Sequence, residues 1–337
     1  MKESILEVRN LCKYFPLHCK GFFQRVTGTA KAVDGVSFEL TQGETLGLVG
    51  ESGSGKTTAV RSILRALRPT SGQVFFRLNG VTHDLATMKE RRLKRLRPKM
   101  QMVFQDPFSS LNPRMTVGGI VGEPLVIHKV AKGSELKDRI AEMLVKVGLK
   151  PHHAMRYPHA FSGGQRQRIG IARALILHPA LLVADEPVSA LDVSVQAQVI
   201  NLLADLQEEF HLAILFVAHD LAVVKHICKR VAVMYAGRLV EVAPTDNLFD
   251  SPQHPYTRGL LSAVPYPDPD VKMRFQIPGE VADPTSLPSG CSFHPRCPNR
   301  SEMCSSFRPE LSCLSGTRSV ACHLYNGGSP PTSVPHH

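Results

Sequence analysis

One segment of the sequence has the residue types and spacing of a phosphate-binding loop. Residues 50–57 read Gly-Glu-Ser-Gly-Ser-Gly-Lys-Thr. The glycines allow the backbone to curl so that its N–H groups point inward, where they and a following helix N-terminus attract phosphate oxygens. Lys56 would place a positive charge at the β- and γ-phosphates, and the Thr57 hydroxyl could ligate Mg²⁺. The residues expected to contact a bound nucleotide are Gly50, Ser52, Gly53, Ser54, Gly55, Lys56, Thr57 and Thr58.

Two adjacent carboxylates end an apolar run later in the chain. Residues 181–184 are continuously apolar, which is typical of a central parallel strand buried on both faces. Asp185 and Glu186 follow at its carboxyl end, where open α/β sheets place their ligands. Asp185 would hold Mg²⁺, directly or through water, and Glu186 would polarise an attacking water. Together with the phosphate loop, this pair predicts an ATP-hydrolysing enzyme.

The elements that must position these residues alternate between strands and helices. Residues 45–50 predict a short buried strand, and residues 58–67 have apolar positions at helical spacing. A further apolar strand is expected over 213–218. Pro107 and Pro113 prevent a continuous helix in their region.

Two amphipathic helices are expected after these prolines. Their patterns cover about residues 117–130 and 134–148. They would form a helical insertion between Gln105 and the segment Phe-Ser-Gly-Gly-Gln at 161–165.

The order of the motifs resembles that of the nucleotide-binding subunit of an ATP-binding cassette (ABC) transporter, over roughly residues 5–325. The motifs that carry the resemblance are residues 50–57, Gln105, residues 161–165, residues 185–186, residues 189–192 and His219. The resemblance implies that Gln105 reaches Mg²⁺ and the water, and that His219 contacts the γ-phosphate as a switch. It also implies that Tyr14 stacks on adenine.

The same resemblance implies that the ATP site is completed by a second subunit. Ser162, Gly163 and Gly164, with Gln165, would clamp the γ-phosphate of ATP held by the opposing subunit. Asp192 would communicate across the dimer. Since Glu186, Gln105, His219 and Lys56 are all present, we expect a hydrolysis-competent half-site rather than a regulatory subunit.

The implied fold class is α/β. It is a phosphate-loop (RecA-like) ATPase core with an antiparallel β subdomain, an inserted α-helical subdomain and an irregular Cys-rich C-terminal extension. The expected divisions are 1–104 for the β subdomain and the first part of the core, 105–165 for the helical subdomain, 166–250 for the second part of the core, 251–325 for the Pro- and Cys-rich extension, and 326–337 for a disordered tail.

Two segments resemble the dipeptide and oligopeptide importer branch, which also contains nickel and glutathione importers. They are residues 106–114 and 254–261. Within the branch, the chain looks most like the second of the two ATPases, usually labelled F. This implies a second ABC ATPase subunit, identical or paralogous, two transmembrane permease subunits and an extracytoplasmic solute-binding protein. The chain would act peripherally at the cytoplasmic face of the inner membrane.

The net charge of +11 raises nucleic acid as an alternative partner. The densest basic patch, residues 89–99, has no aromatic residues for base stacking. Leu93 and Leu96 lie at helical spacing within it, which favours a helix with a solvated basic face. No apolar run has the roughly 18–20 residues that would span a bilayer, and the first residues lack a signal-peptide pattern. Soluble ABC ATPases that act on nucleic acid commonly carry two cassettes in one chain, or a long coiled-coil or zinc insertion. This sequence resembles one cassette without such an insertion, so that class is the less favoured alternative.

Five of the eight cysteines fall between residues 291 and 322, in the Pro-rich extension. Their spacing fits neither the usual zinc pairs nor the bacterial ferredoxin pattern. The family resemblance implies that Cys291, Cys297, Cys304 and Cys322 hold a [4Fe–4S] cluster; zinc or free thiols remain open. Because the segment carries no ATPase motif, we expect loss of Cys291 to leave the phosphate-loop chemistry largely intact.

Overall fold

The structure is a computed structural model that describes residues 3–18, 26–106, 108–263 and 277–325. The chain divides into two compact units. Unit 1 comprises Met1–Glu7, Glu39–Thr45 and Phe75–Ala218. Unit 2 comprises Val8–Phe38, Leu46–Val74 and His219–His337. The tail 326–337, expected to be disordered, lies outside the described residues.

Unit 1 contains three neighbouring parallel strands in the order β8-β7-β6. They are β6 (Met100–Val103), β7 (Leu181–Asp185) and β8 (Ala213–Ala218). Every residue of β7 and β8 is buried. This explains why both strands are continuously apolar, and it confirms the strands predicted over 181–184 and 213–218.

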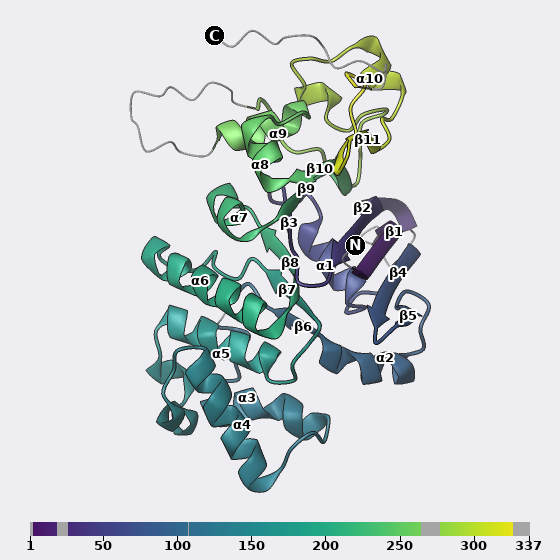
Figure 1. The fold of residues 1–337 in the computed structure, drawn as a ribbon. Coiled ribbons are helices and arrows are strands. Elements are labelled where there is room, and N and C mark those ends of the chain that lie inside the picture. The colour runs from purple at the N-terminus through teal and green to yellow at the C-terminus, as the bar shows by residue number, and fades with distance from the viewer. Residues whose placement is uncertain (1–2, 19–25, 107, 264–276, 326–337) are drawn as a thin grey trace. The chain divides into compact units, whose positions relative to one another are not determined.

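The helices of unit 1 include the predicted insertion. They are α2 (Glu90–Leu96), α3 (Val117–Ile127), α4 (Gly133–Lys146), α5 (Gly163–Leu175) and α6 (Val193–Phe210), with short 3₁₀ turns at Arg97–Lys99, Pro151–Met155 and Pro158–Ala160. Helix α3 packs against α4 and α5, as Figure 1 shows. Helix α4 matches the second predicted amphipathic pattern. Helix α3 lies in the first predicted range, but it is almost entirely apolar, and Val126 and Ile127 at its end are exposed. Leu93 of the basic patch is fully buried and Leu96 is half-buried, whereas the basic residues of α2 are exposed, as predicted.

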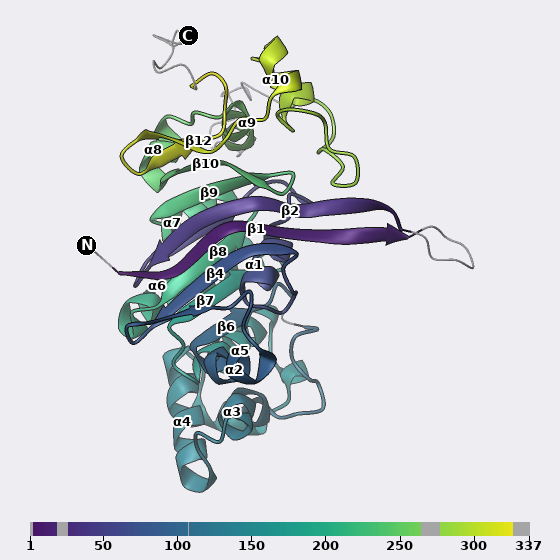
Figure 2. The ribbon, with the colours of Figure 1, turned by 90° about the vertical axis from the view of Figure 1, so that its right-hand side faces the viewer.

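Strands β1 (Ser4–His18), β2 (Val26–Thr41) and β4 (Ser71–Leu78) have residues in both units. Figure 2 shows β1 and β2 as two long neighbouring strands. Within unit 1, β4 pairs antiparallel with β5 (Val81–Asp84). The turn between them uses Asn79 (φ 50°) and Gly80 (φ 76°), the left-handed pair that tight hairpins prefer.

Unit 2 contains a sheet in the order β11-β12-β10-β9-β3. The strands are β3 (Thr45–Val49), β9 (Arg230–Tyr235), β10 (Arg238–Pro244), β11 (Ser312–Ser315) and β12 (Arg318–Val320). Strand β3 is parallel to β9, and the remaining pairs are antiparallel. The helices are α1 (Lys56–Ile63), α7 (Leu221–Ile227), α8 (Thr245–Asp250), α9 (Pro255–Ser262) and α10 (Glu302–Ser306), with the 3₁₀ turn η4 at His294–Arg296.

Part of the C-terminal extension is more regular than its proline content predicts. Strands β11 and β12 form a hairpin whose second strand pairs with β10, with Glu241 opposite Val320. Both strands are short, so no local pattern predicts them. In the part of the chain that the structure describes, no helix is long and apolar enough to span a membrane.

Candidate functional site

The phosphate loop connects β3 to α1, as predicted, and close packing requires glycine at two of its positions. Gly50 has φ 154°, and a Cβ there would lie 2.1 Å from the carbonyl oxygen of Met234. Gly55 has φ 99°, and a Cβ there would lie 2.1 Å from the carbonyl oxygen of Ala32. Gly53 also has a positive φ, 81°, but a Cβ there would meet nothing within 4 Å. The loop is therefore packed at its two ends and open at Gly53.

Lys56 is the first residue of α1, and its ammonium group is folded over the loop. Its Nζ donates to the carbonyl oxygens of Gly50 (2.7 Å) and Glu51 (3.0 Å). Helix α1 starts after Gly55, which has no side chain to cap it, so its first N–H groups face the loop as anion-binding donors. Of the other predicted contacts, Ser52 and Gly53 are exposed, Ser54 is buried, and Thr57 and Thr58 are half-buried. These donors would suit a phosphate group, and the Thr57 hydroxyl is the group expected to help hold Mg²⁺.

Tyr14, the predicted adenine-stacking residue, is held by a buried carboxylate. Its hydroxyl donates to Asp34 Oδ1 at 2.6 Å. Burial and this hydrogen bond raise the pKa of Tyr14, so the phenol stays protonated. Burial alone would raise the pKa of Asp34, but the hydrogen bonds from Tyr14 and Arg238 outweigh it and lower that pKa. Arg308 also lies 3.5 Å from the Asp34 carboxylate. No pattern in the sequence predicts this cluster.

In unit 1, the predicted catalytic carboxylate is paired with the predicted glutamine. Gln105 Nε2 donates to Glu186 Oε2 at 3.0 Å. Glu186 has φ 48°, a left-handed conformation that is uncommon for a residue with a side chain. Its amide donates to Val217 O (3.0 Å), and its carbonyl accepts from the Ser189 hydroxyl (3.1 Å). The hydrogen bonds with Val217 of β8 and with Ser189 thus hold Glu186 in this conformation. Asp185, the last residue of β7, is buried.

Residues 161–165 form the N-terminus of α5. Ser162 is its N-cap: the Ser162 hydroxyl accepts from the Gln165 amide (3.4 Å), and the Ser162 amide donates to Gln165 Oε1 (3.2 Å). Ser162 and Gln165 are both exposed. Gly164 is buried, and a Cβ there would lie 2.3 Å from Val195 Cγ1. This exposed helix N-terminus has the donors that would suit a phosphate group from outside the chain.

Two further predicted residues are exposed at element ends. Asp192 is the N-cap residue of α6, and its carbonyl accepts from the Gln196 amide at 2.8 Å. His219 directly follows β8, as predicted. Each position leaves the side chain accessible to a ligand or a partner.

The four predicted cluster ligands line one small cavity in unit 2. Its volume is about 60 Å³, and Cys291, Cys297, Cys304 and Cys322 all contribute to its wall. All four are free thiols. Burial raises the pKa of Cys291 and of Cys297, and it raises that of Cys322 to about 12. Cys291, Cys297 and Cys322 are therefore protonated near neutral pH unless a metal replaces the protons.

Their arrangement nevertheless differs from that of a formed metal site. Among the residues that the structure describes, no group of three or more His, Cys, Asp or Glu side chains has a metal-binding arrangement. The donor set suits a soft metal, because thiolates favour iron–sulfur clusters and zinc. A metal would have to draw the thiols together.

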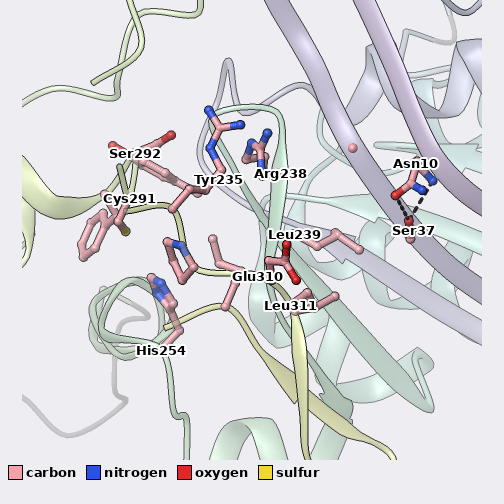
Figure 3. A pocket seen from close by; sticks show the side chains of 16 residues that line it. Asn10, Ser37, Tyr235, Arg238, Leu239, His254, Cys291, Ser292, Glu310 and Leu311 are labelled. Atoms are coloured by element: carbon pink, nitrogen blue, oxygen red, sulfur yellow. Dashed lines mark hydrogen bonds between the residues drawn. The ribbon is translucent and has the colours of Figure 1, made fainter. Parts of the chain in front are cut away.

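A larger cavity of about 580 Å³ in unit 2 shares His254, Cys291 and Phe293 with the wall of the small one. Figure 3 shows Tyr235, Arg238 and His254 around it, with Cys291 and Ser292 nearby. None of the predicted nucleotide-contacting residues lines it. The volume of this cavity therefore gives no support to the predicted nucleotide-contacting residues.

The fold and motifs define an ABC-type ATPase, and comparison with solved structures supports this class. The dimeric post-hydrolysis structure of the ATP-binding cassette MJ0796 with ADP and Pi matches with a TM-score of 0.61 and 28% identity, over 71% of this chain and 98% of that one. CbiO1 from Clostridium perfringens, part of an ABC transporter complex, matches with a TM-score of 0.62 and 26% identity, over 74% and 92% of the two chains.

Sequence comparison identifies the family more closely. Residues 33–189 match the family described as ABC transporter, and residues 240–304 match the oligopeptide/dipeptide transporter C-terminal region. The oligopeptide transport ATP-binding protein AppF of Bacillus subtilis (strain 168) is 52% identical over 96% of this chain and 98% of its own length. A probable peptide ABC transporter ATP-binding protein from Sinorhizobium fredii is 49% identical over 96% and 91%. The chain belongs to the family of ATP-binding subunits of oligopeptide and dipeptide ABC transporters.

Proposed function

We propose that this chain hydrolyses ATP to power the import of peptides across a membrane, as the second ATPase of an importer. Family membership supports the reaction, and the names of its relatives support a peptide cargo. The partners would be a second ABC ATPase, two permease subunits and a solute-binding protein. The chain would act at the cytoplasmic face of the inner membrane. The expected domain divisions, from 1–104 to 326–337, belong to this proposal.

In the proposed reaction, the phosphate loop and Lys56 hold the β- and γ-phosphates, and Tyr14 stacks on the adenine. Thr57, Gln105 and Asp185 would hold Mg²⁺, which supplies positive charge to the phosphates when bound. Glu186 orients the water for in-line attack, and His219 contacts the γ-phosphate. The corresponding segment of the opposing subunit would complete this site. Ser162, Gly163 and Gly164 of this chain, with Gln165, would contact the ATP that the opposing subunit holds. Binding closes the ATPase dimer, and hydrolysis reopens it.

The hydrogen bond between Gln105 and Glu186 is the observation that best supports this chemistry. It places the two side chains together at the carboxyl end of β7. The Glu186→Gln variant should retain ATP binding and lose hydrolysis by roughly 10²–10⁴-fold, the usual contribution of a positioned acid–base group. Phosphate release from the purified transporter complex measures it. Near-normal turnover in the variant would exclude Glu186 as the catalytic carboxylate.

We further propose that Cys291, Cys297, Cys304 and Cys322 ligate a [4Fe–4S] cluster, supported by their placement around one cavity. Protein purified anaerobically from iron-replete cells should contain about four irons per chain and be brown. Removal of the metal with a chelator should increase the number of thiols that react with a thiol reagent by four. One zinc and no iron per chain would support the zinc alternative. If the protein contained neither metal, the four cysteines would be interpreted as structural thiols.

Two alternative cargoes or roles remain distinguishable. Nickel or glutathione would replace peptide if the solute-binding partner bound them, which direct binding measurements would show. Recovery of nucleic acid with the chain, in place of permease subunits in detergent, would instead support a nucleic-acid-directed ATPase. The basic helix α2 offers the densest charge for that alternative.

A further inference from the structure

The second residue of the phosphate loop is held at three points within unit 2. The Glu51 amide donates to the Tyr256 hydroxyl at 2.8 Å, and its carbonyl oxygen accepts from Lys56 Nζ at 3.0 Å. Its carboxylate accepts two hydrogen bonds from Arg296. Nη1 donates to Oε2 at 2.8 Å, and Nη2 donates to Oε1 at 3.1 Å. The amide, the carbonyl and the carboxylate of Glu51 are therefore all fixed.

Arg296 is itself held firmly. Its side chain is only 8% exposed, and its Nε donates to Pro278 O at 2.9 Å. Its guanidinium also lies 5.8 Å from the ring centroid of Tyr235 and 6.0 Å from that of Phe293. Hydrogen bonding to Glu51 raises the pKa of Arg296, so it stays charged. A two-point pair of this kind fixes the carboxylate in direction as well as in distance.

The pairing of Glu51 with Arg296 should affect nucleotide binding, because Glu51 is negatively charged. Glu51 directly follows Gly50, in the loop that would gather the phosphates. An unpaired carboxylate in a partly buried position repels an anionic ligand more strongly than it would in water. Arg296 cancels that charge and keeps the carboxylate turned to itself.

Arg296 comes from the segment that carries two of the cysteines. It ends the 3₁₀ turn η4, and Cys297 follows at once. The His294 amide donates to Cys291 O at 3.0 Å, and the Cys297 amide donates to His294 O at 3.2 Å. Any change that unfolds this turn would displace Arg296 from Glu51.

We propose that Arg296 is a positioning residue for the phosphate loop, acting through Glu51, and that nucleotide affinity thereby depends on the cysteine-bearing turn at residues 291–297. This inference rests on the proposed binding of ATP by the phosphate loop. It replaces the expectation from sequence that the cysteine segment leaves the phosphate-loop chemistry largely intact.

The test is the affinity of the purified full-length chain for a fluorescent ATP analogue. Arg296→Ala should weaken binding roughly tenfold, the scale of a lost hydrogen bond to a charged group. Arg296→Lys, which keeps the charge and loses the two-point geometry, should bind with intermediate affinity. Adding Glu51→Gln to Arg296→Ala should restore most of the loss, because it removes the orphaned charge. Arg300→Gln, an exposed position in the same region, is the matched control and should bind normally.

The outcomes separate this inference from the proposed function. Lys56→Ala should abolish binding; if it binds normally, the phosphate loop is not the nucleotide site and the proposed function fails. If Lys56→Ala loses binding while both Arg296 variants bind like the wild type, the inference alone is overturned. Loss in Arg296→Ala that Glu51→Gln does not relieve would reject the action through Glu51. Circular dichroism confirms folding, and Arg296→Lys provides the comparison if Arg296→Ala does not fold.

Discussion

At the scale of residues, the buried imidazole of His254 shows how a single side chain can make the C-terminal region sensitive to acid. Its Nδ1 accepts from the Tyr256 amide at 3.0 Å and so caps helix α9. Burial lowers the pKa of His254 from 6.5 to about 3, which keeps the ring neutral. The cap requires this neutral form, because a protonated Nδ1 cannot accept a hydrogen bond.

The pH dependence follows from this lowered pKa. Above pH 6.5 neither the folded nor the unfolded chain protonates His254, and the full stabilisation is present. As the pH falls toward 3, the unfolded chain gains a proton that the folded chain excludes, so stability is lost. At about pH 5 we expect a cost of about 2 kcal/mol from this group.

Thermal unfolding at about pH 7.5 and about pH 5 measures the effect. His254→Asn keeps an acceptor at the cap position and cannot titrate. The wild type should lose more stability on acidification than this variant does. Equal losses in the two proteins would mean that other groups dominate the acid response.

At the scale of elements, the turn η4 connects the cysteine cavity with the phosphate loop. Cys297 is the residue after Arg296, and its side chain lines the cavity. If the Arg296–Glu51 pair positions the loop, a change at Cys297 should reach the loop through the same turn.

Cys297→Ser is the variant that tests this connection. It should weaken binding of the ATP analogue in the same direction as Arg296→Ala, whereas Cys313→Ser, an exposed cysteine outside the cavity, should not. Because Ser is a poorer soft-metal ligand than Cys, the variant should also lower the metal content. A lower metal content with unchanged nucleotide affinity would show that changes in the cysteine cavity do not affect the phosphate loop.

At the scale of the whole molecule, the exposed N-terminus of α5 should contribute to the ATP site of the partner subunit. Gly164 is a poor probe of it, since any side chain there meets Val195 within the chain. Gly163 is better, because a Cβ there makes only an ordinary contact with Leu191 at 3.4 Å.

Gly163→Asp should therefore act on the partner's ATP and not on this chain's own. The isolated variant should bind ATP normally. A complex with wild-type partner subunits should hydrolyse ATP at least roughly tenfold more slowly, because the added carboxylate would face a phosphate in a desolvated site. Loss of nucleotide binding by the isolated variant would argue against a site shared between subunits.

Much of this protein could be predicted from its sequence, because local spacing carries the information. Glycines followed by Lys56 and Thr57 predict a phosphate loop wherever they occur between a strand and a helix, and the structure has that strand and helix. Apolar runs predicted β7 and β8 because strands buried on both faces admit few polar residues. The order of the motifs predicted the family, which the relatives confirm.

Only the tertiary structure could decide which distant residues meet. Glu51 and Arg296 are separated by 245 positions, and a single Glu and a single Arg carry no spacing signal. The same holds for Asp34, which pairs with Arg238 across 204 positions, and for the β12–β10 pairing, which joins two parts of the chain that no local pattern links. Periodicity reports how a segment buries its own side chains, whereas a pair between segments depends on how the whole chain packs. The sequence therefore determined the chemistry of the phosphate loop, and the tertiary structure decided which residue of the C-terminal extension holds it.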